Sequence, residues 1–260
     1  MKTETLIVDH NEHLATVFFN RPENMNALNT LMAKELFTVF TELAADRDIW
    51  AVILTGKGDK AFCAGADLKE RKDMSLDQMR LQRDLFVQAF KTVSTFPKPL
   101  IAAVNGYAFG GGFEFALGCD IIYAAENAVF SLPEVSLGII PAGGGTQNLP
   151  RLIAPALAKE LIFTGNRLTA AEAKELGLVR KVTSPEKLSE EAELLAANIM
   201  KNAPLAVWQA KKAINLGLNV DLSTGFALEA ECYNVCLKSA DRDEGLKAFN
   251  EKRKPVFTGQ

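Results

Sequence analysis

The chain has 260 residues, of which 48% are hydrophobic and 23% charged, and its formal net charge is −3. This is the composition of a globular protein with a large core, and its weak negative charge provides no general attraction to nucleic acid or to an anionic membrane. No stretch approaches the roughly 20 apolar residues of a membrane span, and LATVFF near the N-terminus is too short for a signal sequence. We therefore expect a cytoplasmic protein with neither a membrane nor a nucleic acid as its partner.

The first part of the chain alternates strand-like and helix-like patterns. LIVD and LATVFF predict a β-hairpin, and Asn29 can cap a helix over residues 30–45. IWAVILTG and PLIAAVNG are apolar enough to be buried strands. Between them, Ser75 and Gln78 form a capping box that opens a helix running to about Ser94.

The chain becomes mostly helical after the apolar strand IIYAAE, which follows a short predicted helix in FEFALGCD. PRLIAPALAKELIFTG predicts one helix that contains Pro155. VRKVTS predicts a last strand, and further helices are expected over residues 204–217 and 222–250. The order of elements predicts an α/β core carrying the active site over residues 1–195 and a helical region over residues 196–260.

Three glycine-containing loops are the first candidates for a functional site. They are AFCAGADLKE (61–70), NGYAFGGGFE (105–114) and IIPAGGGTQ (139–147). None matches a phosphate-binding loop or a dinucleotide-binding fingerprint. Each is compatible with a tight turn. A glycine run at a helix start also leaves backbone N–H groups unshielded, which suits the binding of an oxyanion.

Two acids stand close to these loops. If a helix begins at Gly111, Glu114 lies in its first turn, where the helix dipole favours the ionised carboxylate. Glu134 has apolar neighbours in SLPEVSLGII, which is a setting that raises a carboxyl pKa into the range of acid–base catalysis. The alternatives are a helix N-terminal charge for Glu114 and a solvated loop acid for Glu134.

The sequence gives little support for a metal site. His10 and His13 lie in HNEH, between two predicted strands, where a turn explains them. Cys232 and Cys236 share a helix face, but no further Cys or His nearby completes a ligand set. We therefore expect no bound metal.

Long segments of the chain resemble the enoyl-CoA hydratases of the crotonase superfamily. The resemblance lies in AFCAGADLKE, in AAVNGYAFGGGFEFALGCDIIYA and in FSLPEVSLGIIPAGGGTQNLPRL, and it extends over residues 6–259. It implies a spiral, ClpP-like α/β fold of repeated ββα units. It also implies that C-terminal helices assemble the chain into a homotrimer, or into a homohexamer built from two trimers.

The same resemblance implies roles for particular residues. The backbone N–H groups of Ala66 and Gly111 would form an oxyanion hole for a thioester carbonyl oxygen. Glu114 and Glu134 would hold one water and add it, in the syn sense, to a trans-2-enoyl-CoA, giving a 3-hydroxyacyl-CoA. No cofactor is implied, since coenzyme A is part of the substrate. The implied CoA contacts are Ala64, Asp67, Leu68, Lys69, Phe249 and Lys252, the last two across a subunit contact.

Other functions compatible with the pattern stay open at this point. AINLGLNVDLSTGFALEAECY resembles the methylglutaconyl-CoA hydratase branch, and another acyl-CoA dehydratase of the same family is a further alternative. The pathway that the family resemblance implies is β-oxidation of fatty acids or breakdown of branched-chain amino acids. An enoyl-CoA isomerase would use one glutamate and add no water. A noncatalytic RNA-binding protein is disfavoured because TLMAKELFTVFTELAADRD has only one lysine.

Overall fold

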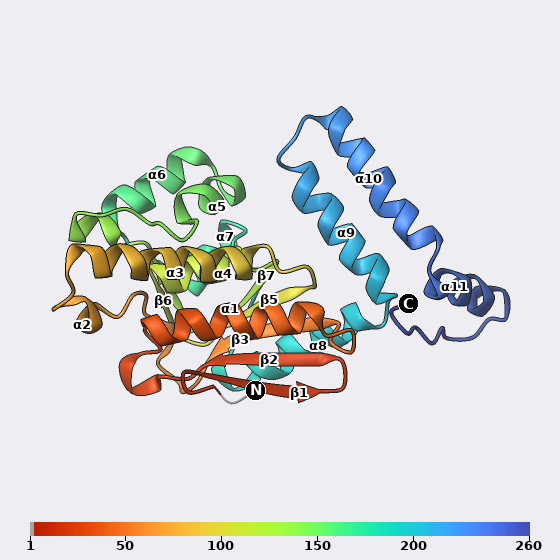
Figure 1. Cartoon of the computed structure of the whole chain (residues 1–260), viewed down its shortest axis with the longest axis horizontal. Helices are drawn as coiled ribbons and strands as arrows, with labels where there is room; N and C mark the ends of the chain where they lie inside the picture. The colour runs from red at the N-terminus through yellow and green to blue at the C-terminus, as the bar shows by residue number, and fades with distance from the viewer. Residues whose placement is uncertain (1–2) are drawn as a thin grey trace.

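The computed structural model describes residues 3–260, whose strands form two sheets with helices packed around them (Figure 1). In the larger sheet β1 is antiparallel to β2 and every other neighbouring pair is parallel. In order across the sheet, its strands are β1 (Leu6–Asn11), β2 (Leu14–Phe19), β3 (Ala51–Gly56), β5 (Leu100–Val104), β7 (Ile121–Ala125) and β10 (Lys181–Thr183). The smaller sheet consists of β4 (Ala61–Cys63), β6 (Tyr107–Phe109), β8 (Val129–Ser131) and β9 (Leu168–Thr169). The predicted N-terminal hairpin is confirmed.

Eleven α-helices follow or separate these strands within residues 3–260. They are α1 (Thr30–Ala45), α2 (Leu68–Arg71), α3 (Leu76–Ser94), α4 (Gly111–Gly118), α5 (Gly145–Leu152), α6 (Pro155–Thr164), α7 (Ala170–Glu175), α8 (Leu188–Met200), α9 (Pro204–Gly217), α10 (Leu222–Leu237) and α11 (Ala240–Asn250). The short 3₁₀ helices are η1 (Pro22–Asn24), η2 (Glu134–Leu137) and η3 (Pro185–Lys187). The Asn29 cap of α1 and the capping box of α3 are confirmed.

One pattern of elements recurs along the chain. A strand of the larger sheet is followed by a strand of the smaller sheet and then by a helix: β3, β4 and α2; β5, β6 and α4; β7, β8 and η2. Parallel strands in each sheet bring the equivalent strand–helix junctions of successive units to the same edge. This confirms the expected ββα units, and it places the three glycine-containing loops close together.

The central strands β3 and β5 of the larger sheet are buried on both faces. On β3, Val52 and Leu54 belong to the main core, while Ala51 and Ile53 belong to a smaller core that includes Leu188 of α8. Successive strand residues point to opposite faces, so a strand covered on both sides has a continuous apolar sequence. This explains why IWAVILTG lacks the alternation of a half-exposed strand.

Two predicted helices are in fact broken. The helix predicted in PRLIAPALAKELIFTG (150–165) is divided between α5 and α6, because Pro155 occupies the first position of α6, where its missing N–H breaks no helical hydrogen bond. The predicted helix over residues 222–250 divides into α10 and α11, because Ser239 caps α11 by accepting a hydrogen bond from Arg242 N at 3.1 Å.

The C-terminal helices α9, α10 and α11 extend away from the body formed by the two sheets (Figure 1). Side chains of α9 attach this arm to the core. Trp208 Nε1 donates to Trp50 O at 3.2 Å, and Lys211 Nζ donates to Lys98 O and to Asp120 Oδ2, both at 2.7 Å. The arm therefore has a defined attachment at its base.

Asn26 organises the loop that precedes α1. Its side chain is fully buried, accepts from Arg21 N at 2.9 Å, and donates to Lys57 O at 3.0 Å and to Ala61 O at 2.7 Å. Its own backbone has a positive φ of 55°. The side chain thus satisfies buried backbone groups in a loop, in a conformation that asparagine tolerates better than most residues.

We predict that Asn26→Ala lowers the free energy of unfolding by about 2–4 kcal/mol, because it leaves buried carbonyl groups unpaired and strains the backbone. Asn24→Ala is the matched control. The Asn24 side chain hydrogen bonds only to the exposed Glu23 carboxylate, so its loss is expected to cost less than about 0.5 kcal/mol. Urea unfolding of both variants measures the difference, and equal midpoints would refute this role of Asn26.

Candidate active site

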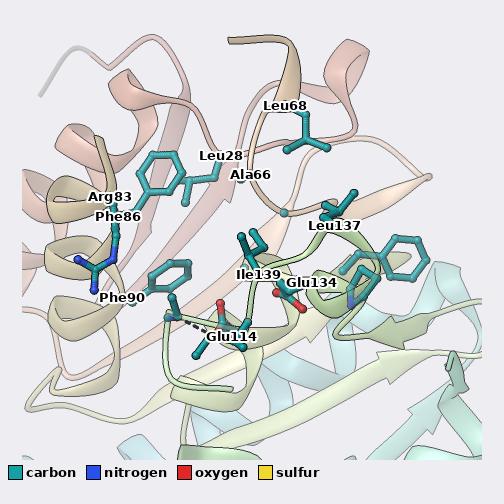
Figure 2. A pocket seen from close by; sticks show the side chains of 18 of the residues that line it. Leu28, Ala66, Leu68, Arg83, Phe86, Phe90, Glu114, Glu134, Leu137 and Ile139 are labelled. Atoms are coloured by element: carbon teal, nitrogen blue, oxygen red, sulfur yellow. Dashed lines mark hydrogen bonds between the residues drawn. The ribbon is translucent and has the colours of Figure 1, made fainter. Parts of the chain in front are cut away.

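A cavity of about 230 Å³ lies where the first two glycine-containing loops, α3 and the segment around η2 meet. Figure 2 shows its lining side chains. Most are apolar, and among the lining residues only Glu114 and Glu134 carry carboxylates. An apolar pocket with a few converging polar groups is the usual form of a small-molecule site.

The first loop presents a free amide at this cavity. Leu28 N donates to Gly65 O at 2.8 Å, and Asp67 N donates to Leu28 O at 2.8 Å, so the loop pairs like a strand on either side of Ala66. The Ala66 N–H itself has no backbone partner among residues 3–260. Gly65 provides the required backbone turn with a φ of +90°.

The glycine triplet of the second loop begins α4 and packs closely against the first loop. Gly110 has a φ of +51°, and a side chain at Gly112 would bring a Cβ atom within 1.9 Å of Cys63 O. Gly111 is the first residue of α4, so its N–H has no partner within the helix. Ala66 and Gly111 both line the cavity. The loops therefore bring two unpaired amides to one site.

Glu114 lies one turn into α4, as predicted, but its electrostatics differ from the prediction. The side chain is only 4% exposed, and burial raises its pKa above the ordinary value. Its Oε1 accepts from Gly143 N at 2.7 Å and from Gly145 N at 2.8 Å, and these bonds oppose the shift. The expectation that the helix dipole favours ionisation was wrong in direction because desolvation outweighs it.

Glu134 is the first residue of η2 and is partly buried at the edge of the same cavity. Burial, together with the charge of Glu114, raises its pKa to about 7, as the apolar neighbourhood predicted. Its buried Oε2 has no hydrogen-bond partner within residues 3–260. Figure 2 shows Glu114 and Glu134 close to each other. One carboxylate is thus fixed by two amides, while the other has an oxygen free for a ligand.

The expected CoA contacts of the first loop fall into two groups. Ala64 and Leu68 line the cavity. Asp67 is not among the lining residues. Its carboxylate caps α2 by accepting a hydrogen bond from Lys69 N at 3.1 Å, and it forms an ion pair with Arg21 at 2.9 Å. Burial acts to raise the pKa of Asp67, but the hydrogen bonds and the charge of Arg21 outweigh it and lower the pKa. Asp67 therefore supports the loop that carries Ala66.

Three other expected CoA contacts lie on the surface, outside the cavity lining. Lys69 is exposed on α2, and Lys252 is exposed just after α11. Phe249 is 83% exposed on α11, which lies at the far end of the molecule from α2 and α4 (Figure 1). Phe249 and Lys252 therefore do not reach the cavity of their own chain.

Several residues of the site were not predicted. Gly143 and Gly145 donate hydrogen bonds to Glu114, whereas AGGGTQ was expected only to form a glycine-containing loop. Phe90 packs so closely on the loops that a Cβ added at Gly111 would lie 2.9 Å from its ring. Arg71 and Arg83 also line the cavity. The sequence did carry a signal for this role of Gly143 and Gly145. They belong to a second glycine triplet that precedes a helix, and such a triplet exposes backbone N–H groups that can bind a carboxylate.

The described part of the chain shows neither a metal site nor a membrane span. Within residues 3–260, no group of three or more His, Cys, Asp and Glu side chains is arranged to hold a metal ion. Every helix in the described part of the chain is too short or too polar to cross a membrane.

Comparison with known proteins shows the family of the chain. The chain is 44% identical to the short-chain-enoyl-CoA hydratase of Clostridium acetobutylicum, over 98% of this chain and 97% of the relative. It is 42% identical to the crotonyl-CoA hydratase of Syntrophomonas wolfei, over 99% of each chain. The crystal structure of an enoyl-CoA hydratase from Bacillus anthracis superimposes with a TM-score of 0.96 at 45% identity, covering 99% of this chain and all of that one. Residues 9–260 match the enoyl-CoA hydratase/isomerase family, and the chain therefore belongs to that family, with the crotonase fold.

Proposed function

We propose that this protein is an enoyl-CoA hydratase, a hydro-lyase that reversibly adds water to a trans-2-enoyl-CoA to give a 3-hydroxyacyl-CoA. The observation that carries this proposal is the meeting of two unpaired backbone amides and two carboxyl groups in one apolar cavity. The relatives' names support it, since two of them are hydratases of short enoyl thioesters.

The amides of Ala66 and Gly111 would bind the thioester carbonyl oxygen. Addition of water at the β-carbon pushes electron density onto that oxygen, so donors fixed in advance stabilise the transition state more than the ground state. Only backbone groups are needed, which is consistent with alanine and glycine at these positions. No cofactor is required, because the thioester of coenzyme A already activates the double bond.

The two carboxyl groups would share one proton and hold the water between them. The ionised Glu114 accepts a proton from the water while the water oxygen bonds to the β-carbon. The protonated Glu134 gives its proton to the α-carbon, where the electron pair of the former double bond forms the new C–H bond. A proton then returns from Glu114 to Glu134 through solvent. Since a water held between the two carboxyl groups would meet one face of the double bond, and the proton would come from the same face, the addition would be syn.

The raised pKa of Glu134 and the fixed position of Glu114 support this division of labour. Glu134 keeps its proton near neutral pH and has an oxygen without a partner. Glu114 is oriented by two amides that stabilise negative charge on its Oε1. An isomerase needs one acid–base group to move a proton along the chain, so the pair favours hydration over isomerisation.

We further propose that the chain assembles as a trimer or hexamer through its C-terminal arm. Large apolar side chains stand exposed on α9 and α10 and in the turn between them, among them Leu218, Leu222 and Phe226. Contiguous exposed apolar surface is typical of subunit interfaces. In such an assembly Phe249 and Lys252 could contact CoA bound to a neighbouring subunit. The proposal also implies a cytoplasmic role in acyl-CoA breakdown.

The direct test is turnover of crotonyl-CoA in water enriched in ¹⁸O. We expect the conjugated enoyl absorbance to fall and one labelled oxygen to enter the product at the β-carbon. Glu114→Gln and Glu134→Gln should each lower kcat by about 10²–10⁴-fold with little effect on unfolding, because each removes one proton-transfer group. Movement of the double bond without ¹⁸O uptake would indicate an isomerase, and near-full activity of either variant would refute the two-carboxylate mechanism.

The pH dependence of hydration follows from the pKa of Glu134. A carboxyl group with a raised pKa keeps its proton up to that pKa and loses it as the pH rises further. Since that pKa is about 7, we expect kcat/KM to be level near pH 6, to be halved at about pH 7, and to fall toward tenfold per pH unit above about pH 8. The profile of crotonyl-CoA hydration between about pH 6 and pH 9 checks this, and a rate that increases with pH across that range would contradict it.

A further inference from the structure

One arginine joins the two backbone segments that meet at the Ala66 amide. Arg21 lies in the loop before α1, and its Nη1 donates to Ala27 O at 2.7 Å. Its Nη2 forms the ion pair with Asp67, the residue that directly follows Ala66. The two segments pair at the bridge between Leu28 and Ala66 (Figure 2). The guanidinium therefore connects them beside that bridge, one residue away from it on each segment.

The bridge sets the direction of the Ala66 N–H. Leu28 N donates to Gly65 O at 2.8 Å, and this carbonyl belongs to the same peptide group as the Ala66 nitrogen. In a planar trans peptide the C=O and N–H bonds point in opposite directions, and this peptide is trans. Because the carbonyl points toward the loop before α1, the N–H points away from it. Any movement of Leu28 relative to Gly65 would therefore turn the Ala66 amide.

The carboxylate of Asp67 is fixed at both of its oxygens. Oδ1 accepts from Lys69 N at 3.1 Å and from Glu70 N at 3.3 Å, which caps α2, and Oδ2 is the atom that pairs with Arg21. The Asp67 backbone N–H in turn donates to Leu28 O at 2.8 Å. The ion pair and the backbone bond thus hold the end of the first glycine-containing loop together.

The geometry does not suit Arg21 to binding an anion of the substrate. Its side chain is 15% exposed and that of Asp67 is 10% exposed, so the two charges face each other and are largely shielded from water. Neither residue is among those that line the cavity. A phosphate of CoA would have to compete with a carboxylate that already neutralises the guanidinium. The contacts of Arg21 therefore indicate a role inside the protein.

We infer that Arg21 is a positioning residue for hydration. Through the two segments that it joins, it holds the Ala66 amide in the direction that binds the developing oxyanion. This inference rests on the proposed hydratase function, in which that amide is one of two donors. A donor that is fixed in advance needs no reorganisation when charge develops on the thioester oxygen. Arg21 thus stabilises the transition state more than the bound substrate, although it touches neither.

The forked shape of the guanidinium is part of this role. Its two Nη atoms donate in different directions, one to a backbone carbonyl and one to a carboxylate. A lysine would keep the positive charge, but its single nitrogen on a flexible chain cannot hold both acceptors in a fixed geometry. We therefore expect Arg21→Lys to keep the ion pair and to lose part of the rate.

The kinetic test is hydration of crotonyl-CoA by Arg21→Met. We expect kcat to fall by about 10–100-fold, which is part of the roughly 10²–10³-fold lost with a whole oxyanion donor, and KM to change by less than about threefold. Asp67→Asn should behave similarly, because it removes the ion pair while its amide oxygen can still cap α2. Lys181→Met is the matched control. It breaks the ion pair between β10 and Glu191 of α8, outside the cavity lining, so its kcat should equal that of the wild-type protein.

A spectroscopic readout separates positioning from a loss of folded protein. Butyryl-CoA with ¹³C at its thioester carbonyl has no double bond to hydrate, and stronger hydrogen bonds to that carbonyl lower its infrared stretching frequency. We expect this frequency to fall when the ligand binds the wild-type protein, and to fall less when it binds Arg21→Met or Arg21→Lys. A role in folding alone would reduce the amount of bound ligand and leave the frequency of the bound carbonyl unchanged.

The possible failures are distinguishable. If Arg21→Met does not fold, Arg21→Lys and Asp67→Asn provide the same test. A wild-type kcat in these variants, a loss that appears only in KM, or a bound carbonyl with the wild-type frequency would overturn the positioning role and leave the hydratase function intact. If the wild-type protein hydrates no enoyl-CoA, the proposed function is refuted, whereas a carbonyl frequency that depends on Arg21 would still support its positioning of the amide.

Discussion

The site depends on the close approach of two backbone segments, residues 63–66 and residues 110–112. A Cβ atom at Gly112 would overlap Cys63 O, and one at Gly65 would lie 2.8 Å from Phe109 O, so the segments can meet only where side chains are absent. This contact positions the amides of Ala66 and Gly111 together and starts the helix that carries Glu114. The glycines therefore set the distance between the two amides that would bind the thioester oxygen and the carboxyl group of Glu114.

The two carboxyl groups show how one apolar cavity can give similar side chains different roles. Burial raises the pKa of both, but Glu114 receives two backbone N–H groups at the start of α5, while the Oε2 atom of Glu134 receives none within residues 3–260. The donors stabilise the ionised form at Glu114, and their absence favours the protonated form at Glu134. The third glycine-containing loop thus makes Glu114 the base and leaves Glu134 as the acid. In this way residues that are far apart in the sequence would act on one water.

Much of this organisation was predictable from local sequence, and the failures have physical causes. The caps at Asn29 and Ser75 and the buried strands follow from residue type and periodicity, which are local. The division of residues 222–250 was missed because no glycine or proline marks the break, which lies at Ser239, the N-cap of α11. The pKa direction of Glu114 was missed because the depth of burial is set by α3 and the third loop, which no local pattern reveals. Arg71 was missed for a similar reason: its place in the cavity wall depends on tertiary contacts with Gln82 and Phe86.

The central claim is that the amides of Ala66 and Gly111 together bind the thioester oxygen of the substrate. A crystal structure of the protein with a saturated short acyl-CoA, which has no double bond to hydrate, tests it most directly. The claim predicts that the thioester oxygen lies about 2.7–3.1 Å from both amide nitrogens, with the β-carbon facing Glu114 and Glu134. A thioester oxygen that hydrogen bonds to neither amide, or an acyl chain that lies outside the cavity, would contradict it.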